Sequence, residues 1–338
     1  MRVALLGAGR IGSAHAATLR RLVGVDELLV ADVDVDRARR AVDDPAAGQV
    51  ADVRATSIDD AFARNPGAVV IAAPTPVHAE LVLRAVRAGI PTFCEKPLAG
   101  SLASTIEVVE QVEGLDAPVQ VGFQRRFDAG YRAAKDALRS GSIGELRRAH
   151  MLTCDPSPPP AEYIETSGGI YRDCHVHDFD IVRWVTGQEV EWVFASGANR
   201  GANFFAAADD VDESAALLRL TDGTLVTLQG SRYNGAGYDV RLELAGTEGT
   251  RSVGLSARSP LVSAEPHTDF PADPPWRNFQ ERFAAAYATE LAAFLDVAAG
   301  RIANPCTPRD ALEALYIAEA ADLSRRECRV VHLKEVRG

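Results

Sequence analysis

The chain of 338 residues carries a formal net charge of −11, and 47% of its residues are hydrophobic. This length suits about two domains of roughly 150 residues each, with enough apolar side chains for packed cores. No basic run exceeds pairs such as Arg39-Arg40 and Arg125-Arg126, so this acidic chain offers no electrostatic support for binding nucleic acid.

Uninterrupted apolar runs of about 18 residues, which a membrane helix needs, are missing from the sequence. The first residues follow an apolar strand pattern, not that of a charged leader with a cleavage site. The five cysteines are scattered and include no Cys-x-x-Cys pair, which favours reduced thiols and argues against a structural zinc. We therefore expect a cytoplasmic protein with no membrane partner and no metal site.

The first predicted elements are a buried strand over residues 2–6, a glycine turn, and a helix from Ser13 to Val23. The turn reads Gly7-x-Gly9-x-x-Gly12, where glycine permits a tight bend and lets the backbone approach a pyrophosphate. Free N–H groups at the start of the following helix favour phosphate binding. The residues expected to contact a dinucleotide here are Gly7, Gly9, Arg10, Ile11 and Gly12.

Asp32 strengthens this interpretation because it ends a second predicted strand, Glu27 to Ala31, and lies 20 residues after Gly12. A carboxylate at that distance is expected to bind the adenosine ribose hydroxyls. It would repel the 2′-phosphate of NADP, and Val33 follows it in place of an arginine or serine, so the sequence favours NAD. Arg37 lies one turn further on and keeps NADP as the alternative.

Helices and strands then alternate to about residue 120, which predicts a parallel sheet and a Rossmann α/β domain over residues 1–120. The predicted helices are Ser57 to Arg64, Val77 to Ala88 and Ser101 to Glu113, and the predicted strands are Ala68 to Ala73, Pro91 to Cys94 and Pro118 to Val121.

Two loops follow strands of this sheet and are expected to line the cofactor cleft, because ligands bind beyond the carboxyl ends of parallel strands. The cofactor contacts expected from them are Thr75, Pro76, His78, Glu95 and Lys96. Lys96 precedes a proline and is also expected to hydrogen-bond a substrate hydroxyl, the alternative being an ordinary solvated lysine. For His78 the alternative is helix capping.

Residues 121–338 are predicted to form an α+β domain that binds substrate and supports oligomerisation, built on a mainly antiparallel open sheet with helices on one side. Residues 256–278 are proline-rich and irregular, and Asp222-Gly223 predicts a hairpin turn. The predicted strands are Glu145 to Thr153, Val190 to Gly197, Ser214 to Leu220, Thr224 to Ser231, Tyr238 to Ala245 and Thr250 to Gly254. The predicted helices are one ending near Arg139, Asn278 to Ala299 and Pro308 to Ser324.

Near mid-chain, the stretch from Gly168 to Trp184 is dense in ionisable side chains and has apolar positions at helical spacing. On a helix, Asp173 would lie one turn before His177 and orient its ring, which is a general-base arrangement. A solvated amphipathic helix is the plainer alternative. A zinc site made of Cys174, His175 and His177 is disfavoured because those side chains diverge on a helix.

These motifs together resemble the Gfo/Idh/MocA oxidoreductases over nearly the whole chain. The marks are Gly7-x-Gly9-x-x-Gly12, Glu95-Lys96-Pro97, and Gly168-Gly169-x3-Asp173-x3-His177-Asp178 followed by Arg183-Trp184. Within the family, Arg125-Arg126-Phe127-Asp128, the Asp155-Pro156 loop and Gly237-Tyr238-Asp239 are similar to segments of the inositol 2-dehydrogenases. Gln124 and Cys154 depart from that pattern, where methionine and arginine are common, which bears on the identity of the polyol.

The resemblance implies an NAD-dependent dehydrogenase of a cyclic polyol, inositol first, that acts as a homotetramer. The implied catalytic residues are Lys96, Asp173 and His177, with His177 as general base. The implied substrate-binding residues are Gln124, Arg125, Asp155, Asp173, His177 and Tyr238. Structural roles for Arg125, Arg126 and Tyr238 stay open. So do three other functions: an aldose or keto-sugar dehydrogenase, an NAD-dependent glycoside hydrolase, and a dinucleotide sensor.

Overall fold

A computed structural model describes residues 1–43, 52–268, 270–271 and 273–337, and the chain forms two compact units. The first unit contains Met1–Gln124 and Ala285–Leu312, and the second contains Arg125–Ala284 and Glu313–Gly338. The predicted boundary near residue 120 lies close to the end of the first segment. Assigning everything after it to one domain is wrong, because a later segment returns to the first unit.

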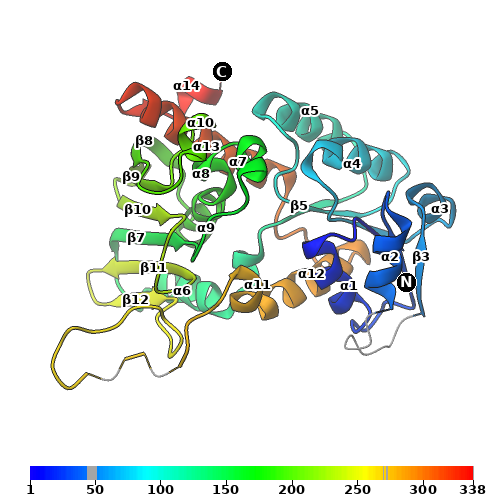
Figure 1. Cartoon of the computed structure of the whole chain (residues 1–338), viewed down its shortest axis with the longest axis horizontal. Coiled ribbons are helices and arrows are strands. Elements are labelled where there is room, and N and C mark those ends of the chain that lie inside the picture. The colour runs from blue at the N-terminus through cyan, green and yellow to red at the C-terminus, as the bar shows by residue number, and fades with distance from the viewer. Residues whose placement is uncertain (44–51, 269, 272, 338) are drawn as a thin grey trace. The chain divides into compact units, whose positions relative to one another are not determined.

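The first unit, whose first segment is coloured blue to cyan in Figure 1, is built on a six-stranded sheet. The strand order is β3-β2-β1-β4-β5-β6, and every pair is parallel. This is the doubly wound order of a Rossmann domain, as predicted. The strands are β1 (Arg2–Leu6), β2 (Glu27–Ala31), β3 (Asp52–Thr56), β4 (Ala68–Ile71), β5 (Thr92–Glu95) and β6 (Val119–Gly122).

The helices of the first unit are α1 (Arg10–Leu19), α2 (Val35–Val42), α3 (Ile58–Ala63), α4 (His78–Arg87), α5 (Leu102–Glu113) and most of α12 (Ala284–Ala298). Helix α12 belongs here because Leu291, Phe294 and Leu295 are buried in one apolar core with Val3 and Leu5 of β1. That burial is the physical reason why the predicted division into residues 1–120 and 121–338 differs from the two units. The apolar pattern of α12 predicts a helix but does not indicate which sheet that helix covers.

Two elements of this unit escaped the sequence analysis. Helix α2 is polar and buries only Ala38, but its N-cap Asp34 accepts hydrogen bonds from the N–H groups of Asp36 and Arg37, a start signal that was present in the sequence. Strand β3 is an edge strand without a fully buried residue, so it lacks the apolar run by which the other strands were found.

The second unit is built on a seven-stranded sheet in the order β12-β11-β7-β10-β9-β8-β13. The pair β7–β10 is parallel and the other pairs are antiparallel, so the prediction of a mainly antiparallel sheet is confirmed. The strands are β7 (Leu146–Cys154), β8 (Val190–Ala198), β9 (Glu213–Leu220), β10 (Leu225–Ser231), β11 (Asp239–Gly246), β12 (Thr250–Val253) and β13 (Val331–His332).

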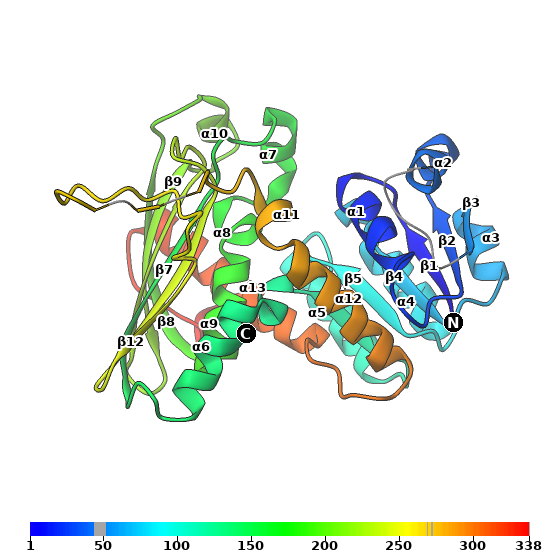
Figure 2. The same cartoon turned by 90° about the horizontal axis from the view of Figure 1, so that it is seen from below.

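Helices cover one face of this sheet, and Figure 2 shows α6, α8 and α9 along it. Burial alternates along β9 and β10, so the opposite face is open, and the predicted turn at Asp222-Gly223 joins these strands, with Gly223 at φ +89°. The helices are α6 (Ala129–Arg139), α7 (Ala161–Ser167), α8 (Ile170–Asp173), α9 (Val176–Thr186), α10 (Phe204–Ala207), α11 (Phe279–Arg282), most of α13 (Pro308–Glu327) and α14 (Lys334–Arg337).

The segment 256–278 contains no helix or strand where the structure describes it, as predicted, with residues 269 and 272 lying outside the described residues. The predicted helix over Asn278 to Ala299 is divided at Phe283 into α11 and α12. No helix in the described part of the chain is long and apolar enough to cross a membrane.

Candidate active site

The glycine turn joins β1 to α1 in the first unit and depends on the absence of side chains at two positions. Gly7 has φ +101°, and a Cβ there would strike the backbone of Ala72 and Ala73. A Cβ on Gly12 would strike the carbonyl of Gly7, so glycine lets α1 start against the turn. Nothing lies within 4 Å of a Cβ on Gly9, which leaves open space beside the backbone. The turn therefore fits the approach of a pyrophosphate.

Asp32 follows β2 and is 6% exposed. Its Oδ2 accepts a hydrogen bond from the N–H of Ala8 at 2.7 Å, and its Oδ1 accepts from the N–H of Asp34 at 2.9 Å. Arg37 donates to Oδ1 at 3.3 Å, so the guanidinium that kept NADP as the alternative is paired with Asp32. The carboxylate thus lies against the glycine turn, as the predicted ribose contact requires.

His78 connects the two predicted cofactor loops. It is 1% exposed, and its Nδ1 and Nε2 each lie 2.7 Å from a backbone carbonyl, those of Pro97 and Ala73. The capping alternative is wrong, because the ring reaches across to the Lys96-Pro97 loop and leaves its own helix uncapped. Thr75 and Pro76 lie in the short 3-10 turn Thr75–Val77 that precedes α4. The cofactor contacts of all three residues stay predictions.

Glu95, at the end of β5, has a partner that the sequence did not reveal. His15 on α1 is 1% exposed, and its Nε2 lies 2.6 Å from Oε1 of Glu95. This contact joins the carboxyl end of β5 to the helix that follows the glycine turn. Nothing in the local pattern of α1 distinguishes His15, since the two residues are 80 positions apart. Lys96 follows directly and is partly buried.

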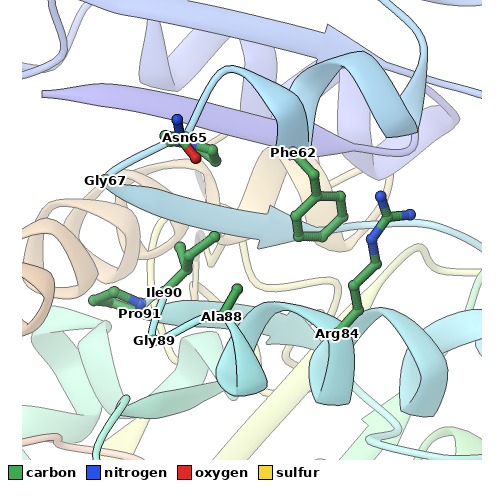
Figure 3. Close-up of a pocket in the computed structure, with 9 residues that line it drawn as sticks. Phe62, Asn65, Gly67, Arg84, Ala88, Gly89, Ile90 and Pro91 are labelled. Atoms are coloured by element: carbon green, nitrogen blue, oxygen red, sulfur yellow. The ribbon is translucent and has the colours of Figure 1, made fainter.

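A cavity of about 400 Å³ lies elsewhere in the first unit (Figure 3). Gly67 and Pro91 line it, and they immediately precede β4 and β5. Arg84 extends over the ring of Phe62, 4.0 Å from its centroid, and forms an ion pair with Asp59. The cavity is thus at the amino ends of these strands, whereas Gly7, Asp32 and Lys96 follow carboxyl ends, so it is not the predicted cofactor site.

In the second unit, the stretch from Gly168 to Trp184 is not one helix. Gly168 and Gly169 have φ +79° and +87°, which confirms the tight entry. Helix α8 ends at Asp173 and α9 begins at Val176, and the carbonyl of Ile170 accepts hydrogen bonds from both Cys174 and His175. This shared acceptor shifts the helical phase, so Asp173 and His177 do not lie on one continuous helix as predicted. Such local irregularities are frequent at functional sites.

Asp173 is held by side chains from two other elements. Its Oδ1 accepts from the hydroxyl of Tyr163 on α7 at 2.8 Å, and its Oδ2 accepts from Nη2 of Arg232 at 2.8 Å. Nη1 of Arg232 lies 3.4 Å from Oδ2 of Asp155, and the thiol of Cys174 is 3.7 Å from the same oxygen. Burial raises the pKa of Asp155, with the positive charge of Arg232 opposing the shift.

Arg125 lies in a buried network behind this cluster. Its Nη1 donates to Oδ1 of Asp178 at 2.5 Å, and Nδ1 and Nε2 of His175 each lie 2.8 Å from oxygens of Asp178 and Ser214. Burial acts to raise the pKa of Asp178, but the charge of Arg125 and the contacts with His175 outweigh it and lower the value to about 2. A histidine held in this way does not converge with Cys174 on a metal, so the zinc alternative fails on geometry.

Most of the remaining predicted substrate residues are buried. Gln124 is 4% exposed and ends the first unit's first segment. Tyr238 is 5% exposed just before β11, its electrostatic neighbours include Arg125, Asp155 and Cys174, and burial raises its pKa. Arg126 forms a buried ion pair with Asp180, so the interpretation of Arg125 and Arg126 as helix-start charges is wrong. His177 lies in the first turn of α9 and is partly exposed.

Known families match both units. The oxidoreductase family with an NAD-binding Rossmann fold matches residues 1–123, and the GFO/IDH/MocA C-terminal domain matches residues 131–252. The chain belongs to the Gfo/Idh/MocA family. The chain is therefore an NAD-dependent oxidoreductase, and the open glycine turn with Asp32 beside it fits that cofactor.

Relatives within the Gfo/Idh/MocA family are similar along their whole length. The myo-inositol dehydrogenase Hyg17 of Streptomyces leeuwenhoekii is 38% identical over 96% of this chain and 97% of its own. The structure of a myo-inositol dehydrogenase from Corynebacterium glutamicum matches with a TM-score of 0.88 and 34% identity, over 98% of both chains. The structure of a scyllo-inositol dehydrogenase from Lactobacillus casei, with NAD(H) and scyllo-inositol bound, matches with a TM-score of 0.84 and 27% identity, over 99% of both chains.

Proposed function

We propose that the protein oxidises one ring hydroxyl of an inositol to a ketone, with NAD as the acceptor of the hydride. The observation that carries this proposal is the cluster of Asp155, Asp173, Tyr163 and Arg232 close to the first turn of α9. A polyol needs such a concentration of donors and acceptors, because each hydroxyl is recognised by hydrogen bonds. The similar inositol dehydrogenases support the choice of substrate.

In this mechanism His177 takes the proton of the reacting hydroxyl, since an imidazole changes its charge near neutral pH. Asp173 stabilises the imidazolium that forms, and it is itself held by Tyr163 and Arg232. Lys96 hydrogen-bonds the oxygen on which negative charge develops. NAD, when bound, supplies the nicotinamide that accepts the hydride. His177 acts as the acid in the reverse direction.

Recognition of the other ring hydroxyls is assigned to the predicted substrate-binding side chains. Asp155 accepts hydrogen bonds from hydroxyls, and Tyr238, Arg125 and Gln124 border the substrate. In the first unit, NAD contacts the turn from Gly7 to Gly12, Asp32 on its ribose, and the two loops at the carboxyl ends of β4 and β5. Those loops supply Thr75, Pro76, His78, Glu95 and Lys96.

We also propose a cytoplasmic homotetramer that pairs through the open face of the second sheet. Phe194 on β8 is 41% exposed and Leu225 on β10 is 46% exposed, and pairing of subunits through this face would remove both side chains from water. The five cysteines are all free of disulfides, which suits a reducing compartment.

The test is the initial rate of reduced-cofactor formation with myo-, scyllo- and chiro-inositol, glucose and xylose, each with NAD and with NADP. We expect one inositol with NAD to give the highest kcat/KM. A preference for an aldose would replace inositol with a sugar as substrate. Binding of NAD without net reduction by any polyol would contradict the proposal and favour the glycoside hydrolase or sensor alternatives.

A further inference from the structure

Arg232 lies one residue beyond β10 and is buried, with 2% of its side chain exposed. Its two terminal nitrogens bind different carboxylates, Nη1 to Asp155 and Nη2 to Asp173. The planar fork of a guanidinium fixes both directions at once, which the single ammonium of a lysine does not do. The geometry thus joins the loop after β7 to the end of α8 through one side chain.

The charge of Arg232 matters as much as its shape. Asp155 and Asp173 lie close enough to repel one another, and each is largely removed from water. Two buried carboxylates without a cation between them would either separate or take up a proton. Tyr163 offers Asp173 a hydrogen bond but no charge. Arg232 therefore supplies a positive charge that favours the ionised form of both carboxylates and fixes their directions.

We infer that Arg232 is the positioning residue of this site, holding Asp155 towards the substrate and Asp173 towards its role beside His177. The inference rests on the proposed function, because it assumes that these two carboxylates bind and process the polyol. Arg232 acts through them and does not itself touch the reacting atoms. Its loss should lower kcat through Asp173 and raise KM through Asp155.

The experiment compares Arg232→Ala and Arg232→Lys with Arg325→Ala, a control on α13 where Arg325 is 14% exposed and paired with Asp322. Rates are expressed per NAD-binding site, so unfolded protein does not count. We expect Arg232→Ala to lower kcat by about tenfold to a hundredfold and to raise KM. Millimolar guanidinium should restore part of the activity of Arg232→Ala, with a dependence on guanidinium concentration that saturates. It should not affect the activity of Arg325→Ala. Arg232→Lys, which keeps the charge without the fork, should recover only part of kcat.

A second readout does not depend on turnover. Arg232 interacts electrostatically with the thiol of Cys174, so removing its charge should slow the alkylation of Cys174 at a fixed pH, followed by peptide mass spectrometry. If wild-type protein oxidises no inositol, the proposed function fails. The rate of Cys174 alkylation in Arg232→Ala, and its restoration by guanidinium, still test the position of Arg232 in that case. Wild-type kcat and KM in Arg232→Lys and Arg232→Ala, or unchanged alkylation in Arg232→Ala, would overturn the inference.

Discussion

At the scale of single residues, Asp32 and His177 have the clearest assigned tasks, and they belong to different units. The sequence predicted Asp32 from its distance to the glycine turn, and the structure places its carboxylate against that turn. Arg232 and His15 escaped prediction because their partners lie 59 to 80 positions away in the chain. Spacing rules act over one or two helical turns, so contacts of that separation are invisible to them.

Replacing His177 with alanine should greatly lower turnover and leave cofactor binding intact. A general base contributes about a hundredfold to ten-thousandfold to the rate, so kcat should fall by that range. His177 is not among the proposed cofactor contacts, which are the glycine turn, Asp32 and the two loops after β4 and β5, so the Kd for NAD should not change. Steady-state rates give kcat, and a fluorescence titration with NADH gives the Kd for the cofactor. Turnover within tenfold of wild type would remove His177 from the mechanism.

Asp32→Ala should weaken NAD binding and reduce the preference over NADP. Hydrogen bonds to a charged group contribute about 1.5–3 kcal/mol, which predicts a rise of about tenfold to a hundredfold in the KM for NAD. Loss of the negative charge also leaves Arg37 available to a 2′-phosphate. Asp36→Ala is the control, since Asp36 is exposed and paired with Arg39. An unchanged ratio of kcat/KM between NAD and NADP would contradict the assigned role of Asp32.

At the scale of elements, most strands were predicted within one or two residues. Buried parallel strands of the first sheet are continuous apolar runs, and strands of the second sheet such as β9 and β10 alternate buried and exposed residues. The stretch from Gly168 to Trp184 shows where this approach fails. Its periodicity predicted one helix, but the carbonyl of Ile170 is shared by two N–H groups, and side chains from α7 and the end of β10 hold Asp173. Tertiary contacts therefore determine the break, and no local pattern contains them.

The glycine turn makes a prediction that separates packing from cofactor binding. Gly12→Ala puts a Cβ against the carbonyl of Gly7, so it should lower the free energy of unfolding by about 1–3 kcal/mol in the absence of NAD. Gly9→Ala meets nothing within 4 Å and should leave that stability unchanged while weakening NAD binding. Urea unfolding and NAD titration of both variants test this. Equal stability of the two variants would contradict the described packing.

The buried network of Arg125, His175 and Asp178 at the start of α9 should make the free energy of unfolding depend on pH in the acidic range. The folded pKa of Asp178 is about 2, below its ordinary value of 3.8, so the ionised form stabilises the fold above pH 4. This contribution, of about 2 kcal/mol, is lost as the pH falls from about 4 to 2. Urea unfolding at pH 6, 4 and 3 should therefore show a steeper loss for wild type than for Asp178→Asn. Parallel curves for the two proteins would exclude this role.

At the scale of the whole molecule, the sequence predicted a Rossmann domain and an α+β domain, and both are present. It could not predict that the chain returns to the first unit after Ala284, because an apolar helix fits either core.

The open face of the second sheet is where we expect subunits to pair. Phe194→Asp combined with Leu225→Asp should convert a tetramer into smaller species in sedimentation velocity. Val23→Asp, at an exposed site of the first unit, is the control, and an unchanged tetramer would contradict the assigned face.

In the proposed reaction, a hydride leaves a ring carbon of an inositol for NAD. The most direct test uses the inositol that the wild-type protein oxidises best, with deuterium on the carbon that becomes the ketone. Mass spectrometry of the NADH formed should find one deuterium per molecule, and none when the label is on another ring carbon. Unlabelled NADH from the first substrate, or no NADH at all, would show that this hydride transfer does not take place.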